Sequence, residues 1–163
     1  MKESRFLRGD SRMLEALKSL DIFEPFEDNH IEGLLELSKL KTYAPNEAII
    51  REGEIDNWIY FLLSGKVKVI KGGIELCQLS DVGEVFGEMA IIEAKERSAT
   101  VAAVENTECL AVDASYMDRL KGNERIVFMY ILYRIFSELL AGRLRVTTDQ
   151  LVMARKNLAH LGV

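Results

Sequence analysis

Apolar residues recur at intervals of three and four positions over residues 11–40, a period that is typical of amphipathic helices. Glu24-Pro25 interrupts the pattern, and proline disfavours a helical conformation in the residue before it. The pattern therefore predicts two short helices. We expect the second to begin at Asn29, whose side chain can cap the helix while Glu32 returns a bond in a capping box.

The pattern changes over residues 42–113, where short apolar runs alternate with glycines at intervals of about ten residues. The run K-V-K-V-I at 66–70 alternates lysine with valine, as expected of a strand with one buried face. Gly72-Gly73 follows and can supply the two positive φ angles of a tight hairpin. Many short strands separated by glycine corners predict a compact β barrel or roll.

Strand signals stop after Asp113. Residues 115–120 predict a brief helix, and Asn123 is suited to cap a long helix that runs to about Ala159. Two stripes of apolar residues run along this long helix. One consists of Tyr133, Phe136, Leu140, Leu144, Thr147, Leu151, Ala154 and Leu158, and the other includes Ile131, Ile135 and Leu139. We expect the helix to pack first on the β unit and then on a second copy of itself in a coiled-coil-like seam. The alternative is that it folds back on the N-terminal helices of the same chain.

Length and composition limit the organisation. The 163 residues, 48% of them hydrophobic and 29% charged, suffice for one domain with a substantial core. We therefore expect a single domain, 1–163, with N-terminal helices at about 11–40, a β unit at about 42–113 and C-terminal helices at about 115–160. A net charge of −5 disfavours a surface that holds nucleic acid or an anionic membrane by charge. No signal peptide or membrane span is evident, so we expect a soluble, cytoplasmic protein.

Few residues suit catalysis or metal binding. His30 and His160 lack a second ligand at metal-binding spacing, and we expect both at the surface. Cys77 and Cys109 lie in apolar runs without a C-x-x-C pattern, which predicts two buried, reduced thiols. The carboxylates of E-G-E-I-D at 52–56 are interpreted as a solvated turn. We therefore expect no enzymatic activity and no bound metal.

The stretch F-G-E-M-A-I-I-E-A-K-E-R-S-A-T-V combines groups that suit a phosphate and a sugar. Gly87 lets a ligand approach the backbone, and the residues after it can form a helical turn whose free N–H groups attract an anion. Arg97 presents a planar fork for two phosphate oxygens, and Glu88 suits a sugar hydroxyl. Ser98 and the backbone N–H of Ala99 could complete the phosphate shell. The stretch predicts a phosphate-plus-ribose pocket; the alternative is a surface ion pair between Glu88 and Arg97, worth about 0–1 kcal/mol.

Several motifs, in order along the chain, resemble the cyclic nucleotide-binding domain family. They are E-G-E-I-D-N-W-I-Y-F-L-L-S-G-K-V-K-V, the glycine at 83, F-G-E-M-A-I-I and R-S-A-T-V, within a match of residues 20–150. The family occurs in catabolite-activator-type regulators, in regulatory subunits of cyclic-nucleotide-dependent kinases and in cyclic-nucleotide-gated channels. The resemblance implies a mainly β fold, a β-roll (double-stranded β-helix or jelly roll) with N-terminal helices and a long C-terminal helix. It also implies that the segment between the last two motifs is a phosphate-binding cassette.

The resemblance implies roles for individual residues. Glu88 is similar to the glutamate that holds the ribose 2′-hydroxyl, and Arg97 to the arginine that pairs with the cyclic phosphate. In the catabolite-activator branch the long helix dimerises and supplies base contacts, and R-L-R-V-T-T-D resembles that portion. It implies a base contact for Thr147, a hydroxyl from the partner chain for Thr148 and a place near the ribose for Arg143. The spacing from Arg97 is several residues longer than usual, and the alternative role of Thr147 is to set coiled-coil register. Further cassette contacts are implied for Phe86, Gly87, Met89, Ala90, Ser98 and Ala99.

The expected function is that of a stand-alone, dimeric sensor of cyclic AMP in signal transduction, acting through an unknown effector protein. Cyclic GMP is less favoured, but a threonine hydroxyl can serve either base. Transcription factors of the family continue into a helix-turn-helix domain, whereas only four residues follow Ala159, so we expect no DNA binding. Two alternatives are a ligand-free β-roll interaction scaffold and a truncated regulator of the same family.

Overall fold

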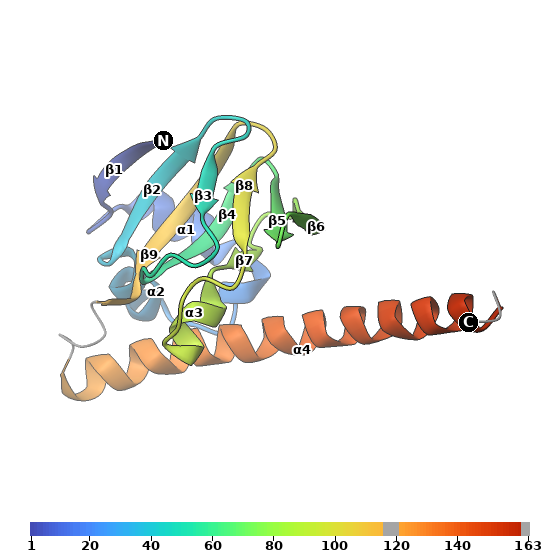
Figure 1. Ribbon diagram of the computed structural model, residues 1–163. Helices are drawn as coiled ribbons and strands as arrows, with labels where there is room; N and C mark the ends of the chain where they lie inside the picture. Colours follow the sequence, from blue (N-terminus) through green and yellow to red (C-terminus); the bar gives the residue numbers. More distant parts are fainter. Residues whose placement is uncertain (116–120, 161–163) are drawn as a thin grey trace. The chain divides into compact units, whose positions relative to one another are not determined.

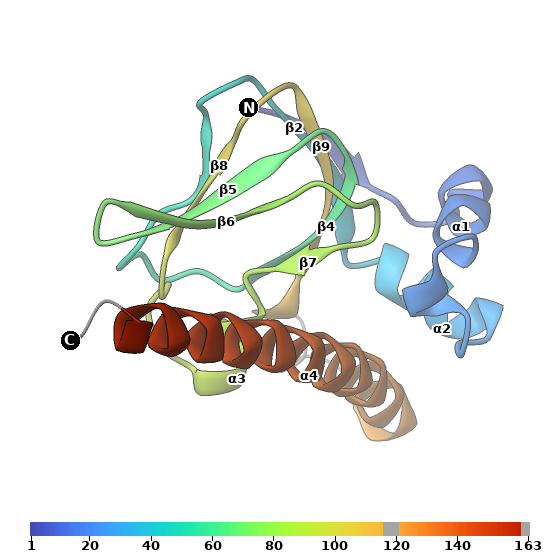
Figure 2. The same cartoon turned by 90° about the vertical axis from the view of Figure 1, so that its right-hand side faces the viewer.

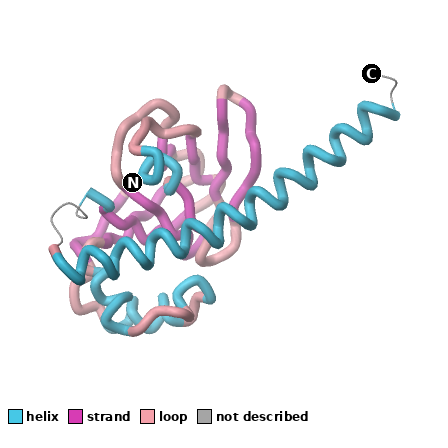
Figure 3. Tube along the Cα trace, turned by 90° about the horizontal axis from the view of Figure 1, so that it is seen from below, coloured by secondary structure: helices cyan, strands magenta, loops and turns pink. Residues whose placement is uncertain are grey.

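A computed structural model describes residues 1–115 and 121–160. The chain divides into two compact units, Met1–Met129 and Tyr130–Val163. The first unit contains the strands and the short helices, and the second contains most of the long helix α4 (Gly122–His160) (Figure 1). In the first unit the strands are grouped together (Figure 3), and the N-terminal helices lie at their side (Figure 2).

Antiparallel pairing joins the described strands into two sheets that face each other in a roll (Figure 2). The five-stranded sheet has the order β1-β2-β9-β4-β7 and the four-stranded sheet the order β3-β8-β5-β6. The strands are β1 (Lys2–Phe6), β2 (Ser38–Tyr43), β3 (Ala48–Ile50), β4 (Trp58–Ser64), β5 (Val67–Lys71), β6 (Ile74–Leu79), β7 (Val85–Phe86), β8 (Thr100–Ala103) and β9 (Thr107–Asp113). The predicted fold class, mainly β with flanking helices, is confirmed.

The hydrophobic core lies between the two sheets. Its cluster of buried residues comprises Tyr43, Ile50, Tyr60, Leu62, Val67, Leu79, Phe86, Val101, Ala103, Cys109 and Ala111. Val67 is buried in this cluster and Val69 packs against it, as the lysine–valine alternation predicted. Gly72 and Gly73 have φ angles of +54° and +82°, which confirms the hairpin between β5 and β6.

Three short helices precede the roll, namely α1 (Ser11–Lys18), η1 (Asp21–Phe23) and α2 (Asp28–Leu35). Phe23 contacts Phe61 of β4 with ring centroids 5.4 Å apart, on the face opposite to Tyr60, so the helices cover the outer face of the larger sheet. The predicted cap of the second helix is wrong. Glu27 is the N-cap and forms the capping box with His30, so Asn29 lies inside the helix.

Two further expectations need correction. The N-terminal strand β1 was not predicted, because K-E-S-R-F has no apolar alternation; it forms an edge of the five-stranded sheet by pairing with β2. The thiol of Cys109 is buried as expected, but Cys77 is exposed. The reason is that Cys77 lies on β6, the edge strand of the smaller sheet, where all residues but Leu79 are exposed.

The long helix α4 confirms the predicted final element, although it begins at Gly122, so Asn123 is inside its first turn. Side chains in its first half, including Ile131 and Ile135, are buried, whereas Leu144, Leu151 and Leu158 are exposed. The brief helix expected at 115–120 lies mostly outside the described residues. Within the described ranges, none of the helices combines the length and the apolar character that crossing a bilayer requires.

Candidate functional site

The phosphate-and-sugar segment folds as a short helix between two strands. After β7 the chain turns at Gly87 into α3 (Glu88–Glu93) and returns to the roll at β8. Gly87 has a φ of +87°, a conformation that costs other residues about 1–2 kcal/mol. A Cβ atom here would lie 2.8 Å from Arg97 Nη1 and 3.1 Å from the carbonyl oxygen of Trp58. The helical turn is as predicted, and in this structure the group that approaches Gly87 closely is the Arg97 guanidinium.

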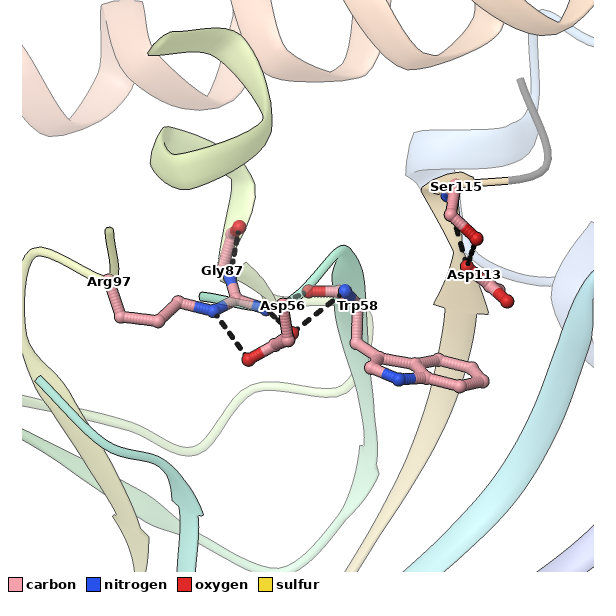
Figure 4. A network of polar contacts seen from close by, with 6 residues as sticks. All are labelled: Asp56, Trp58, Gly87, Arg97, Asp113 and Ser115. Atoms are coloured by element: carbon pink, nitrogen blue, oxygen red, sulfur yellow. Dashed lines mark hydrogen bonds and ion pairs between the residues drawn. The ribbon is translucent and has the colours of Figure 1, made fainter. Parts of the chain in front are cut away.

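The guanidinium of Arg97 is held by three acceptor groups and is only 3% exposed. Its Nε donates to Asp56 Oδ2 at 3.0 Å, and its Nη2 donates to Asp56 Oδ1 and to the carbonyl oxygen of Trp58. Its Nη1 donates to the carbonyl oxygen of Gly87 at 2.6 Å (Figure 4). The cation is therefore fixed in position by a bidentate ion pair with the Asp56 carboxylate and by two backbone carbonyls.

The backbone of Arg97 is fixed by the loop between β3 and β4. The N–H of Gly53 donates to the Arg97 carbonyl oxygen at 2.9 Å, and the Arg97 N–H donates to the Glu54 carbonyl oxygen at 2.8 Å. The next residue of the cassette, Ser98, accepts a hydrogen bond on its carbonyl from Lys71 Nζ at 3.1 Å. Both the main chain and the side chain of the arginine are thus tied to the roll.

Asp56 is the site residue that the sequence reasoning missed. Its carboxylate belongs to E-G-E-I-D, which was interpreted as a solvated turn, yet its side chain is only 31% exposed. Burial alone would raise the pKa of Asp56. The hydrogen bonds from Arg97 and from the backbone N–H of Trp58, together with the charges of Arg97 and Lys41, outweigh burial and hold this pKa below its usual value. A useful signal was its position two residues before the buried strand β4, where a charge needs a partner.

Replacing Asp56 with asparagine should destabilise the fold near neutral pH and have less effect in acid. The folded pKa of Asp56 lies below its unfolded value of about 3.9, so the pair stabilises the fold above that value. This contribution is lost as the pH falls through the lower folded pKa. Urea unfolding of wild type and Asp56→Asn at several pH values measures the difference in unfolding free energy. We expect that difference to shrink below about pH 4.

The matched control for this prediction is Asp28→Asn, which removes an exposed ion pair with Lys18. It should change the unfolding free energy by no more than about 1 kcal/mol at any pH. A difference in unfolding free energy between wild type and Asp56→Asn that does not depend on pH would contradict a folded pKa of Asp56 below its unfolded value.

Glu88 is the first residue of α3 and is only 2% exposed. A carboxylate at this end of a helix lies beside free backbone N–H groups. Because Glu88 and Arg97 are both buried and Arg97 pairs with Asp56, the alternative of a surface ion pair between Glu88 and Arg97 is wrong. Two buried, oppositely charged side chains therefore lie on one segment, nine positions apart in the sequence.

The other cassette residues have different environments. Phe86 is buried in the core and stacks on Tyr60 with ring centroids 5.2 Å apart, which indicates a packing role. Ala90 is buried, whereas Met89 is exposed and its sulfur lies 3.7 Å from Ser98 Oγ. Ala99 is partly buried. The segment is thus anchored in the core at its first residue and open to solvent at Met89.

A family model described as cyclic nucleotide-binding domain matches residues 40–123, just over half of the chain. The chain belongs to the cyclic nucleotide-binding domain family. The matched range includes most of β2, all of β3 to β9, Asp56 and the whole cassette.

Similar proteins support this family. The cGMP-dependent protein kinase of Toxoplasma gondii is 32% identical over 130 residues, which cover 79% of this chain and 13% of the kinase. The cyclic AMP receptor protein of Thermus thermophilus is 32% identical over 100 residues, 59% of this chain and 46% of that protein. The chain therefore spans less than half of either relative.

Two solved structures are similar in fold. The crystal structure of the Thermus thermophilus catabolite activator protein aligns with a TM-score of 0.64 and 29% identity, over 81% of this chain and 62% of that one. A cyclic nucleotide-binding domain from Methylobacillus flagellatus aligns with a TM-score of 0.75 and 20% identity, over 90% of this chain and 86% of that one.

The helix residues that were expected to contact the base or lie near the ribose are in the second compact unit. Thr147 is exposed and Arg143 is partly buried. Thr148 donates its hydroxyl hydrogen to the Leu144 carbonyl oxygen at 2.7 Å, which leaves its lone pairs for other donors. The base contact of Thr147, the contact from Thr148 of the partner chain and the place of Arg143 near the ribose remain predictions.

A cavity of about 500 Å³ on the first unit of the cyclic nucleotide-binding domain is separate from the cassette; it is lined by Met1, Lys2, Thr42, Tyr43, Ala44, Glu47, Ser64, Asn106, Thr107 and Glu108. None of these is a predicted site residue. Over residues 1–115 and 121–160, no group of three or more His, Cys, Asp or Glu side chains is arranged to hold a metal ion.

Proposed function

We propose that this domain is a receptor for a cyclic nucleotide, with Arg97 bound to the cyclic phosphate and Glu88 to the ribose. The observation that carries the proposal is the buried Arg97, held by Asp56 and two carbonyls beside a buried Glu88. A cation fixed in this way needs little reorganisation to bind an anion.

The donor inventory of Arg97 supports a phosphate contact. A guanidinium has five N–H donors. The described residues accept from Nε, from Nη1 once and from Nη2 twice. One Nη1 hydrogen therefore has no acceptor in the described part of the chain and is the donor that a phosphate oxygen would use.

The preferred ligand is cyclic AMP, with cyclic GMP as the second candidate. Relatives named for each nucleotide support the ligand class without separating the two bases. The hydroxyls of Thr147 and Thr148 can accept from the adenine amine but can also donate to guanine, so they do not separate the two bases.

We further propose a homodimer through α4. The exposed leucines at 144, 151 and 158 recur every seven residues, the repeat of a two-stranded seam. Sedimentation equilibrium should give a dimer mass, and a monomer mass with and without cyclic AMP would contradict this part of the proposal.

The proposed role is regulatory and cytoplasmic: ligand binding changes a surface that an effector protein recognises, without catalysis or DNA contact. The second candidate is a ligand-free scaffold. The buried charges of Glu88 and Arg97 disfavour it, because burial of ionised groups is costly and a scaffold has no use for them.

Ligand binding should raise thermal stability. At a concentration of 100 times the dissociation constant, cyclic AMP should stabilise the fold by about 2.7 kcal/mol. Calorimetric titration supplies the dissociation constants for cyclic AMP and cyclic GMP, and thermal unfolding measures the shift. Linear 5′-AMP, which lacks the cyclic phosphodiester, is the control. Binding of both cyclic nucleotides weaker than millimolar would contradict the proposal and favour the scaffold.

A further inference from the structure

Two lysines lie on the inner face of the five-stranded sheet, beside its core residues. Lys39 and Lys41 alternate with Leu40 on β2 and share the face of Tyr43, a member of the core cluster. Their partners on β9 are small, Ala111 and Cys109. Small residues on β9 leave room for the long lysine side chains to reach across to the aromatic residues of β4.

Lys41 is an ammonium in an unusual place, because its side chain is only 7% exposed. Its Nζ lies 3.7 Å from the ring centroid of Trp58 and 5.8 Å from that of Tyr60. The nearest ion-pair partner is Glu3 Oε2 at 4.0 Å. Within the described residues the Lys41 ammonium makes no hydrogen bond, so an aromatic face and neighbouring charges hold it. Burial lowers its pKa, and the charges of Glu3, Asp56 and Asp113 oppose this effect.

Glu3 brings a negative charge to these lysines from the edge strand β1. Its Oε1 accepts a hydrogen bond from Lys39 Nζ at 3.0 Å, and Glu3 is the register partner of Lys41. The Lys39 hydrogen bond, with the charges of Lys39 and Lys41, lowers the pKa of Glu3 although burial raises it. Lys39 Nζ also lies 4.8 Å from the ring centroid of Phe6, so Lys39 contacts two side chains of β1.

Trp58 connects the lysines to the phosphate site. The Lys41 ammonium lies over its indole ring. Its backbone N–H donates to Asp56 Oδ1 at 2.9 Å, and its carbonyl oxygen accepts from Arg97 Nη2. The charges therefore alternate in sign from the sheet edge to the cassette: Glu3, Lys41, Asp56, Arg97.

We propose that this alternating row sets the affinity of Arg97 for the ligand phosphate, with Lys41 and Glu3 as positioning residues that act through Asp56. The inference rests on the proposed function. A bound phosphate places a second negative charge beside the Asp56–Arg97 pair. Lys41 offsets that charge by attracting Asp56, and Glu3 opposes binding by engaging Lys41. The two side chains therefore act on affinity in opposite directions.

Calorimetric titration with cyclic AMP and with cyclic GMP tests the row. Lys41→Met keeps the length and the packing on Trp58 but removes the charge, and it should weaken binding at least about fivefold. Glu3→Gln should strengthen binding about twofold, a smaller effect because Glu3 is partly solvated. Lys41→Arg, which restores a cation over the indole, should return most of the lost affinity.

Two matched controls separate this effect from net charge and from loss of folding. Lys68→Met removes a lysine from the outer face of β5, and Glu36→Gln removes the exposed partner of Arg8. Neither should change affinity by more than about 1.5-fold. Thermal unfolding of each unliganded variant reports folding, and a purely structural role would move Lys41→Met and Glu3→Gln in the same direction.

The outcomes are distinct. Opposite shifts for Lys41→Met and Glu3→Gln, with rescue by Lys41→Arg, support the row. Shifts in one direction, or no larger than those of the controls, overturn it even when wild type binds the nucleotide. Absence of binding by folded wild type overturns the proposed function instead, and the row with it.

Discussion

Replacement of Arg97 with alanine should weaken the binding of cyclic AMP by at least about 2 kcal/mol, a factor of roughly 30. The substitution removes a buried cation that is pre-oriented by Asp56 and by the carbonyl oxygens of Gly87 and Trp58. It also leaves the Asp56 carboxylate to repel the incoming phosphate. Calorimetric titration at constant ionic strength measures the loss.

Two controls separate binding from folding in this experiment. Arg51→Ala removes an exposed arginine, paired with Glu54, from the loop that holds the Arg97 backbone, and should leave affinity unchanged. Arg97→Ala also leaves Asp56 without its partner, so the fold should lose stability. The double variant Arg97→Ala/Asp56→Ala should recover much of that stability without recovering affinity. Wild-type affinity in folded Arg97→Ala would refute the phosphate role of Arg97.

Replacement of Gly87 with alanine should damage both the fold and the site. The new Cβ would lie 2.8 Å from Arg97 Nη1 and 3.1 Å from Ile50 Cδ1, at a φ of +87°. We expect a loss of about 2–4 kcal/mol in unfolding free energy from the strain and the contacts. Displacement of Arg97 should weaken cyclic nucleotide binding at least about tenfold. Urea unfolding and calorimetric titration measure the two effects.

Gly73→Ala is the matched control, because Gly73 has a similar φ of +82° and no atom within 4 Å of an added Cβ. It should cost only the backbone strain, about 1–2 kcal/mol, and leave affinity unchanged. Equal stability losses for Gly73→Ala and Gly87→Ala, with equal affinities, would show that Arg97 is not held where the structure places it.

The elements that the sequence predicted correctly depend on local rules. Gly72-Gly73 can adopt positive φ angles at little cost, so the hairpin follows from two adjacent residues. The alternation of lysine and valine is visible within the five residues of β5. The helical period of α4 is likewise visible in each turn, and it repeats along the helix. The cassette prediction uses the same kind of signal, since Gly87, Glu88 and Arg97 lie within one continuous stretch, and its ligand contacts stay predictions.

The expectations that failed concern neighbours that are distant in the sequence. Cys77 has the apolar surroundings of a buried thiol, and only the strand order makes β6 an edge. The strand β1 has no pattern of its own and exists because β2 offers a free edge with lysines opposite Glu3 and Phe6. Asn29 met the sequence rule for a helix cap, but Glu27 and His30 form the capping box two residues earlier.

Local chemistry in the sequence was therefore enough to predict the roll and the long helix, and it points to Glu88 and Arg97, whose ligand contacts stay predictions. The sequence did not predict Asp56 as the partner of Arg97, because Asp56 lies 41 positions away and a carboxylate in a glycine-containing turn is usually solvated. Closure of the roll brings the β3–β4 loop against the cassette, buries Arg97 and leaves the Asp56 side chain only 31% exposed. Desolvation turns an ordinary surface carboxylate into the group that orients Arg97, and it depends on the packed structure as a whole.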